Sequence, residues 1–364
     1  MKKWNKATRT SLFTYGLVIV AFAALQILGS DLIRQGGMLS SSLRGQLVPI
    51  CAYVVMAISL NLTVGVLGEL SLGHAGFMSV GAFAGVTAAI SLQGAIPSGG
   101  ARLAIAMVIG ALCAAAAGVL VGIPVLRLNG DYLAIVTLAF GEIIKNIITC
   151  LYVGMDDRGL HFNILGGADA LNLRTGGRVI INGPVGIAGI QKLSTFTAGF
   201  VLILITLFIV LNTVNSRTGR AIMALRDNRI AAESVGINVT KYKLIAFVTS
   251  AALAGASGAL FSMNFSTIVP TKFDFNTSIL VLVFVVLGGL GNMWGSIVAA
   301  AALTILPEAL RQFSDYRMLV YAIVLILVML ATNNPTVKAL LGRLRERSPL
   351  RRNKAAGKEG GNHA

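Results

Sequence analysis

Long apolar runs separated by short polar breaks dominate the chain. Most are close to the roughly 20 residues that a helix needs to cross a bilayer. The runs lie at 11–29, 46–65, 71–91, 103–124, 131–153, 196–213, 243–266, 277–290, 294–307 and 317–333. The second and third runs are nearly fused, as are the eighth and ninth, so each pair is either two spans or one span with a re-entrant piece. The pattern predicts an all-α, polytopic transmembrane bundle of eight to ten spans.

The composition agrees with a membrane protein. Of the 364 residues, 55% are hydrophobic and 12% are charged, whereas soluble chains carry roughly 25% charged residues. The mean hydropathy is +0.80. The N-terminus resembles a signal peptide, with Lys2 and Lys3 before an apolar run, but no convincing small-residue cleavage site follows. We therefore interpret 11–29 as a retained first span.

The net charge of +16 is concentrated at the ends of the apolar runs. Basic residues precede the first run, six lie in 215–243 (the basic loop) and eight lie in 338–358. Clusters of Lys and Arg at span ends orient a membrane protein with those ends in the cytoplasm. We favour this interpretation, together with contact to anionic lipid, over nucleic-acid binding.

The charge pattern and the run count predict one topology. With the N-terminus in the cytoplasm, ten spans leave the basic loop and the C-terminus inside. The predicted regions are a cytoplasmic N-terminus at 1–10, a transmembrane region at 11–345, an external loop at 154–195 and a disordered basic tail at 346–364. The external loop is rich in Gly, Asn and Pro, which indicates turns and allows a short hairpin.

The sequence has no constellation of residues typical of an enzyme. Its three histidines, His74, His161 and His363, lie far apart, and it has no HExxH motif, paired catalytic carboxylates, nucleophile elbow or P-loop. Its cysteines lack the CxxC spacing of metal or redox sites and are interpreted as small hydrophobes. We expect no catalytic residue, no metal and no bound cofactor. If transport uses ATP, another subunit must hold the nucleotide.

Polar residues inside the runs are candidates for a translocation path, because such groups are costly in a membrane and usually face a cavity or a partner. The candidates are Asn61, Glu69, Ser71, His74 and Glu142. An alternative for Glu69 is that it caps a broken helix. For Glu142 the favoured alternative is a structural pair with Lys145, three residues away on one helix face. A half-helix that begins within 69–76 would offer amides to a substrate carboxylate.

Glycines recur at spacings that bring helices together. Gly81 and Gly85, and likewise Gly291 and Gly295, have the small-xxx-small spacing of close helix contacts in lipid. Glycine-interrupted segments can also mark broken helices along a transport path. We favour helix packing.

The basic loop has the pattern of short helices. In "DNRIAAESVG", Asp227 or Asn228 is a candidate N-cap and Gly236 a candidate left-handed end. The upstream "GRAIMALR", which holds Arg220 and Arg226, is also compatible with a helix. The loop is either an interfacial segment bound to lipid headgroups or a docking element for a cytoplasmic partner, and the residues alone leave both open.

Five segments resemble the permease subunits of ABC importers for branched-chain amino acids, and the resemblance covers nearly the whole chain except its termini. They are "LNLTVGVLGELSLGHAGFMSVGAFA" (60–84), "LNGDYLAIVTLAFGEIIKNI" (128–147), "NGPVGI" (182–187), "SRTGRAIMALRDNRIAAESVGINVTKYKLIAFVTSAALAGASGAL" (216–260) and "LGGLGNMWGSIVAA" (287–300). Together they are specific, although each alone is weak. With its long loop at 154–195, the chain resembles the longer of the two sister permeases of this family.

The resemblance implies that the basic loop couples the chain to an ATPase. The importer signature of two alanines, three variable residues and a glycine matches Ala231, Ala232 and Gly236. Ile230 stands where that signature has an acidic residue, and its later proline is absent. The implied coupling residues are Arg220, Arg226, Asp227, Asn228, Ala231, Ala232, Glu233 and Gly236.

The resemblance also implies partners and a location. The family works with a second permease subunit, two cytoplasmic ATPase subunits and a soluble substrate-binding protein, in the bacterial inner membrane with both termini cytoplasmic. Related permeases carry urea, short amides or other small organic solutes, so these substrates remain alternatives. A stand-alone secondary transporter is less favoured because few buried carboxylates suit ion coupling.

Overall fold

The computed structural model describes residues 41–310 except 129, 157, 158, 165, 168 and 174–176, together with 16, 316 and short pieces between 319 and 327. One compact unit runs to Ile305, and a second begins at Leu306. The predicted N-terminus, the run 11–29, most of the run 317–333 and the tail 346–364 lie outside the described residues.

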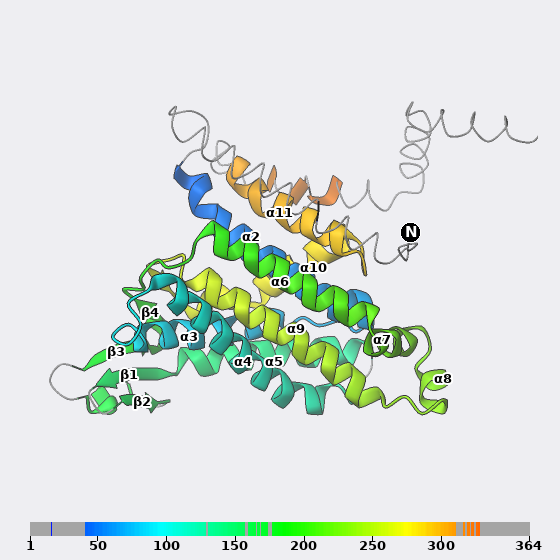
Figure 1. Ribbon diagram of the computed structural model, residues 1–364, viewed down its shortest axis with the longest axis horizontal. Coiled ribbons are helices and arrows are strands. Elements are labelled where there is room, and N and C mark those ends of the chain that lie inside the picture. Colours follow the sequence, from blue (N-terminus) through cyan, green and yellow to red (C-terminus); the bar gives the residue numbers. More distant parts are fainter. Residues whose placement is uncertain are drawn as a thin grey trace, which may run out of the picture. The chain divides into compact units, whose positions relative to one another are not determined.

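The described chain is mainly helical (Figure 1). The helices are α2 (Ser41–Asn61), η1 (Leu62–Leu67), α3 (His74–Ser91), α4 (Gly99–Val125), α5 (Asp131–Thr149), α6 (Phe196–Asn215), α7 (Arg217–Asp227), α8 (Arg229–Ser234), α9 (Val239–Ser262), α10 (Phe275–Gly288) and α11 (Met293–Ala309), with the short η2 (Asp169–Leu171), η3 (Gly183–Val185) and η4 (Pro270–Phe273). Among the described residues, seven helices are long and apolar enough to cross a membrane. The prediction of a polytopic helical bundle is therefore confirmed.

Polar side chains set where several of these helices begin. Ser98 accepts a hydrogen bond from the Ala101 amide (3.3 Å) and starts α4. Thr195 accepts one from the Ala198 amide (3.2 Å) and starts α6. Asn238 accepts one from the Lys241 amide (3.0 Å) and starts α9. Each cap satisfies an amide that the first turn leaves free, so polar positions between apolar runs define the spans.

Helix α9 packs closely against α3 and α4, and glycines allow the approach. A Cβ on Gly81 would lie 2.1 Å from the Gly255 carbonyl oxygen, and one on Gly110 would lie 2.7 Å from the Gly81 oxygen. Gly85 lies against Ala259 in the same way. Helix packing is thus the role of Gly81 and Gly85, as favoured from the sequence.

The predicted runs 46–65 and 71–91 form two separate helices. Helix α2 continues into η1, a π-helical turn with i→i+5 hydrogen bonds, and Gly68 ends it in the left-handed conformation with φ +81°. Residues 69–73 then lead to α3. Because π-helical turns are rare and gather at functional positions, the break between α2 and α3 marks a region of interest.

The predicted external loop contains strands. β1 (Tyr152–Asp156) pairs antiparallel with β2 (Gly159–Asn163) and with β3 (Arg178–Asn182) in the order β2-β1-β3. Val153 lies opposite Phe162 on one side and Ile181 on the other. A second pairing joins β4 (Ile187–Ala188) to β5 (Thr267–Ile268), which follows α9. Figure 1 shows these strands at one end of the bundle, the sheet end, and α7 and α8 at the other, the loop end.

Candidate functional site

The basic loop forms two short capped helices at the loop end. Helix α7 follows Ser216, whose hydroxyl accepts a hydrogen bond from the Gly219 amide (3.2 Å). Asn228 then caps α8 by accepting one from the Ala231 amide (3.0 Å), so of the two predicted caps it is Asn228 that acts. Gly236 follows α8 with φ +85°, as predicted.

Helix α8 has one face inside and one face outside. Ala232 packs with Leu225 and Val239 in a small core that holds the two helices of the loop against α9. On the outer face, Ile230 is 80% exposed, and Val235, directly after the helix, is 74% exposed. The predicted coupling residues Arg220, Asp227, Asn228, Ala231, Glu233 and Gly236 are also exposed. Helices α7 and α8, with Val235 and Gly236, therefore form a stiff, partly apolar projection from the bundle, which we call the knob.

Arg226 reaches inward from this knob, although part of it remains exposed. Its Nη1 donates a hydrogen bond to the carbonyl oxygen of Gly65 in η1 (2.6 Å). A Cβ on Gly68 would lie 2.8 Å from Arg226 Cγ. Arg226 is thus a direct link between the basic loop and the π-helical end of α2.

Two of the predicted path residues, Asn61 and His74, join helices together. Asn61 donates to Ser296 Oγ (2.9 Å) and accepts from the Gly291 amide (2.8 Å), which ties α2 to α11 and to the turn before it. His74 Nε2 lies 2.8 Å from Ser59 Oγ. All four of these side chains are buried, so their hydrogen bonds offset the cost of removing polar groups from water.

Glu69 forms an ion pair with Lys243, a residue that the sequence reading did not select. Their side chains are 15% and 4% exposed. Glu69 therefore fastens the linker after η1 to α9. The N-cap position of α3 is Gly73, so Glu69 does not cap that helix, and its place along a path stays a prediction. Lys243 was recognisable only as a cation at the start of a long apolar run.

Ser71 differs from these neighbours. It is fully buried, and its Oγ has no hydrogen-bond partner among the described residues.

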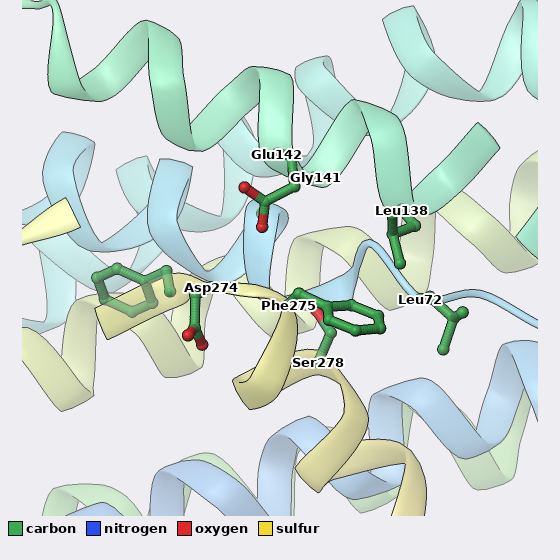
Figure 2. Close-up of a pocket in the computed structure, with 9 residues that line it drawn as sticks. Leu72, Leu138, Gly141, Glu142, Asp274, Phe275 and Ser278 are labelled. Carbon is green, nitrogen blue, oxygen red and sulfur yellow. The ribbon is translucent and has the colours of Figure 1, made fainter. Parts of the chain in front are cut away.

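The predicted path residue Glu142 lines a pocket (Figure 2). The lining residues come from the α3 start, the middle of α5 and the α10 start: Leu72, Gly76, Leu138, Gly141, Glu142, Phe273, Asp274, Phe275 and Ser278. In Figure 2, Glu142 extends from α5 toward the start of α10. Glu142 also pairs with Lys145, as predicted. The pocket thus combines two carboxylates, a nearby ammonium group and apolar walls.

The start of α3 borders this pocket and lies inside the bundle. Gly81 and Gly85 face Gly255 and Ala259, so α3 and α9 run parallel. At about 1.5 Å per residue, this register places the start of α3 beside α9 at a point roughly 13 Å from the N-terminal end of α9. Helix α3 thus begins at His74, inside the 69–76 segment, and it is itself long enough to cross a membrane; that its first amides meet a substrate carboxylate stays a prediction.

Two amides at the α3 start already have side-chain partners. The Leu72 amide donates to Thr137 Oγ1 (3.1 Å) and the Ala75 amide donates to Ser278 Oγ (3.1 Å). Asp274 and Ser278 were missed from the sequence. The available signal was an acidic residue immediately before an apolar run.

Comparison with known proteins agrees with this arrangement. Residues 43–329 match the family described as branched-chain amino acid transport system / permease component. The chain is 33% identical over 290 residues to the high-affinity branched-chain amino acid transport system permease protein LivM of Salmonella typhimurium. The aligned region is 76% of this chain and 66% of the relative. LivM of Escherichia coli K12 is 33% identical over 296 residues, with the same shares covered.

A shorter similarity reaches a sugar permease. The ribose import permease protein RbsC of Haemophilus influenzae is 31% identical over 130 residues, which is 34% of this chain and 40% of the relative. No solved structure is significantly similar to the chain. The family match covers most of the chain, and its helices are long enough to span a membrane. The chain is an integral membrane protein that belongs to the branched-chain amino acid transport permease family.

Proposed function

We propose that the chain is a permease subunit of an ATP-driven importer for branched-chain or other hydrophobic amino acids. Family membership and the names of the LivM relatives support this role. The chain itself breaks no bond and needs no cofactor, and ATP is held by partner ATPases. The other proposed partners are a sister permease and a soluble substrate-binding protein.

The exposed knob of the basic loop is the observation that carries the proposal. Ile230 on α8 and Val235 directly after α8 are 80% and 74% exposed, and α8 is held in place by caps and by a buried core. A rigid apolar projection loses little conformational entropy when it enters a groove. We assign the groove to a cytoplasmic ATPase subunit, because family members of this kind work with one.

The proposed orientation follows from charge. The loop end carries the six basic residues of 215–243, and positively charged loops remain in the cytoplasm. The loop end and both termini are then cytoplasmic, in the bacterial inner membrane. The sheet end faces outward, where it would meet the substrate-binding protein.

We place the path of an amino acid that crosses the membrane beside Glu142. The ammonium group of the substrate requires an acceptor and its carboxylate requires a donor, because both are costly to bury alone. Glu142 and Asp274 supply carboxylates, Lys145 supplies a cation, and Phe273 and Phe275 supply apolar surface. Helices α5 and α10 bury only 22% and 28% of their span residues within the chain, which leaves surface for the sister permease.

A mechanism by alternating access follows. ATP binding closes the ATPase dimer, moves the knob and, through Arg226, moves η1. Such a partner shifts the equilibrium between outward-open and inward-open states only if it contacts α8 differently in the two states.

Co-purification tests the ATPase contact. The chain is isolated from its native membrane in mild detergent, intact or as Ala231→Arg, and the associated ATPase is identified by mass spectrometry. Thr240→Arg is the matched control, since it adds the same charge at another exposed position of the loop end. We expect the ATPase to accompany the intact chain and the control but not Ala231→Arg.

Retention of the ATPase by Ala231→Arg, or its absence from the intact chain, would refute the proposed contact. A stand-alone secondary transporter would then be the better explanation. If the ATPase is present but uptake is specific for urea or a short amide, the transport class stands and the proposed substrate is wrong.

A further inference from the structure

Arg102 is a buried cation without a counterion. It lies in the first turns of α4 and is 5% exposed. Its Nη2 donates a hydrogen bond to Gln191 Oε1 (2.6 Å), which is a neutral acceptor. Its Nε is buried and has no partner, and the described carboxylates form no salt bridge with it. A buried guanidinium in this state is unfavourable unless another group supplies negative charge.

The Arg102 side chain lines a small pocket, the Arg102 pocket. Most of the other lining residues are apolar, and Gln93 and Gln191 add amide groups. The lining residues are Val86, Ala89, Ile90, Gln93, Arg102, Gly189, Ile190, Gln191, Leu193 and Met263. An occupant must therefore combine a negatively charged group for Arg102 with apolar surface for the walls.

The Arg102 pocket lies where three spans end. Helix α3 ends at Ser91, α4 begins at Gly99 and α9 ends at Ser262. Span ends lie at the level of the lipid headgroups. Further along α4, Val108 and Leu112 are 59% and 64% exposed and give the helix an apolar outer surface.

We propose that Arg102 binds the phosphate group of an anionic phospholipid in the leaflet at the sheet end. Guanidinium matches phosphate oxygens with paired, charge-assisted hydrogen bonds. The pocket side of the Arg102 guanidinium group would donate to these oxygens, and the apolar walls would hold the glycerol and upper acyl carbons. The inference is independent of the ATPase contact and of the substrate.

Native mass spectrometry of the purified full chain tests the proposal. The chain is exchanged into detergent with added phosphatidylglycerol, phosphatidylcholine or inorganic phosphate. We expect one phosphatidylglycerol to remain bound to the wild type, and about tenfold lower occupancy in Arg102→Met, because a charge-assisted contact is lost. Lys192→Met is the matched control, since it removes a positive charge from the exposed residue next to Gln191. This variant should retain the lipid.

Each other outcome has a defined meaning. Equal lipid retention by wild type and Arg102→Met would overturn the proposal, as would the absence of any retained lipid. Displacement of phosphatidylglycerol by millimolar inorganic phosphate would show that free phosphate, rather than lipid, is the occupant. If Arg102→Met does not fold, Gln191→Ala is measured instead, since it removes the Arg102 partner; retention reduced in Gln191→Ala supports the site and unchanged retention contradicts it.

Discussion

At the scale of single residues, polar groups inside the spans act mostly as connections between helices. Asn61, His74 and Glu69 were selected from the sequence because intramembrane polar groups are rare and costly. The structure gives each a specific partner: Ser296 and the Gly291 amide, Ser59, and Lys243. The sequence could show that these groups need partners, but the partners lie up to 235 positions away, and only the fold brings them together.

The Glu69–Lys243 pair gives a stability prediction. Lys243→Met leaves the Glu69 charge with little solvent and no cation. Removal of one member of a buried ion pair costs about 3–5 kcal/mol, and the partial exposure of Glu69 places the expected loss toward the lower end. Thermal unfolding of the detergent-solubilised chain measures it. The double variant Glu69→Gln/Lys243→Met should regain most of the loss, and a single variant as stable as the wild type would contradict the prediction.

Glu142 gives a transport prediction. If its carboxylate receives the substrate ammonium group, Glu142→Gln removes a charged acceptor and should raise the KM for leucine uptake about tenfold or more. Uptake is measured in proteoliposomes that contain the complete importer. Glu142 also pairs with Lys145, so Lys145→Gln is the control for loss of that pair alone. Equal kinetics in Glu142→Gln and the wild type would remove Glu142 from the path.

At the scale of elements, the apolar runs predicted the helices well because a span must be long and apolar. The caps of the basic loop were also predictable, since Asn228 and Gly236 act through local geometry. The π-helical turn η1 and the strand β3 were not predictable from the sequence. The turn is held partly by Arg226, which contacts Gly65 across 161 positions, and β3 joins β1 after an intervening hairpin and loop. Such contacts leave no periodic signal in a single sequence.

The Arg226 contact predicts a separation of docking from transport. Arg226→Gln removes the charged donor to Gly65 but leaves Ile230 on α8 and Val235 after it exposed. We expect the ATPase to remain bound while uptake per ATP hydrolysed falls several-fold, because the link to η1 is weakened. Arg217→Gln, at an exposed position of α7, should transport normally. Full coupling in Arg226→Gln would show that motion reaches the spans by another route.

At the scale of the whole molecule, alternation of the spans places the basic loop and the strands at opposite ends. The sequence predicted this separation from the distribution of charge and from the number of apolar runs. Seven spanning helices and the shorter α11 lie among the described residues, and two further predicted runs lie largely or wholly outside them. The count of eight to ten and the cytoplasmic termini stay predictions.

Orientation decides whether the knob can meet an ATPase at all, and labelling measures it directly. In a chain whose three native cysteines are replaced by Ser or Ala, Ile230→Cys places a thiol on the knob and Val185→Cys places one at the sheet end. Both parent residues are well exposed, at 80% and 58%. Because basic loops stay in the cytoplasm, a membrane-impermeant maleimide should label Val185→Cys in spheroplasts and Ile230→Cys only in inverted vesicles. The reverse pattern would place the knob outside, where no cytoplasmic ATPase can reach it.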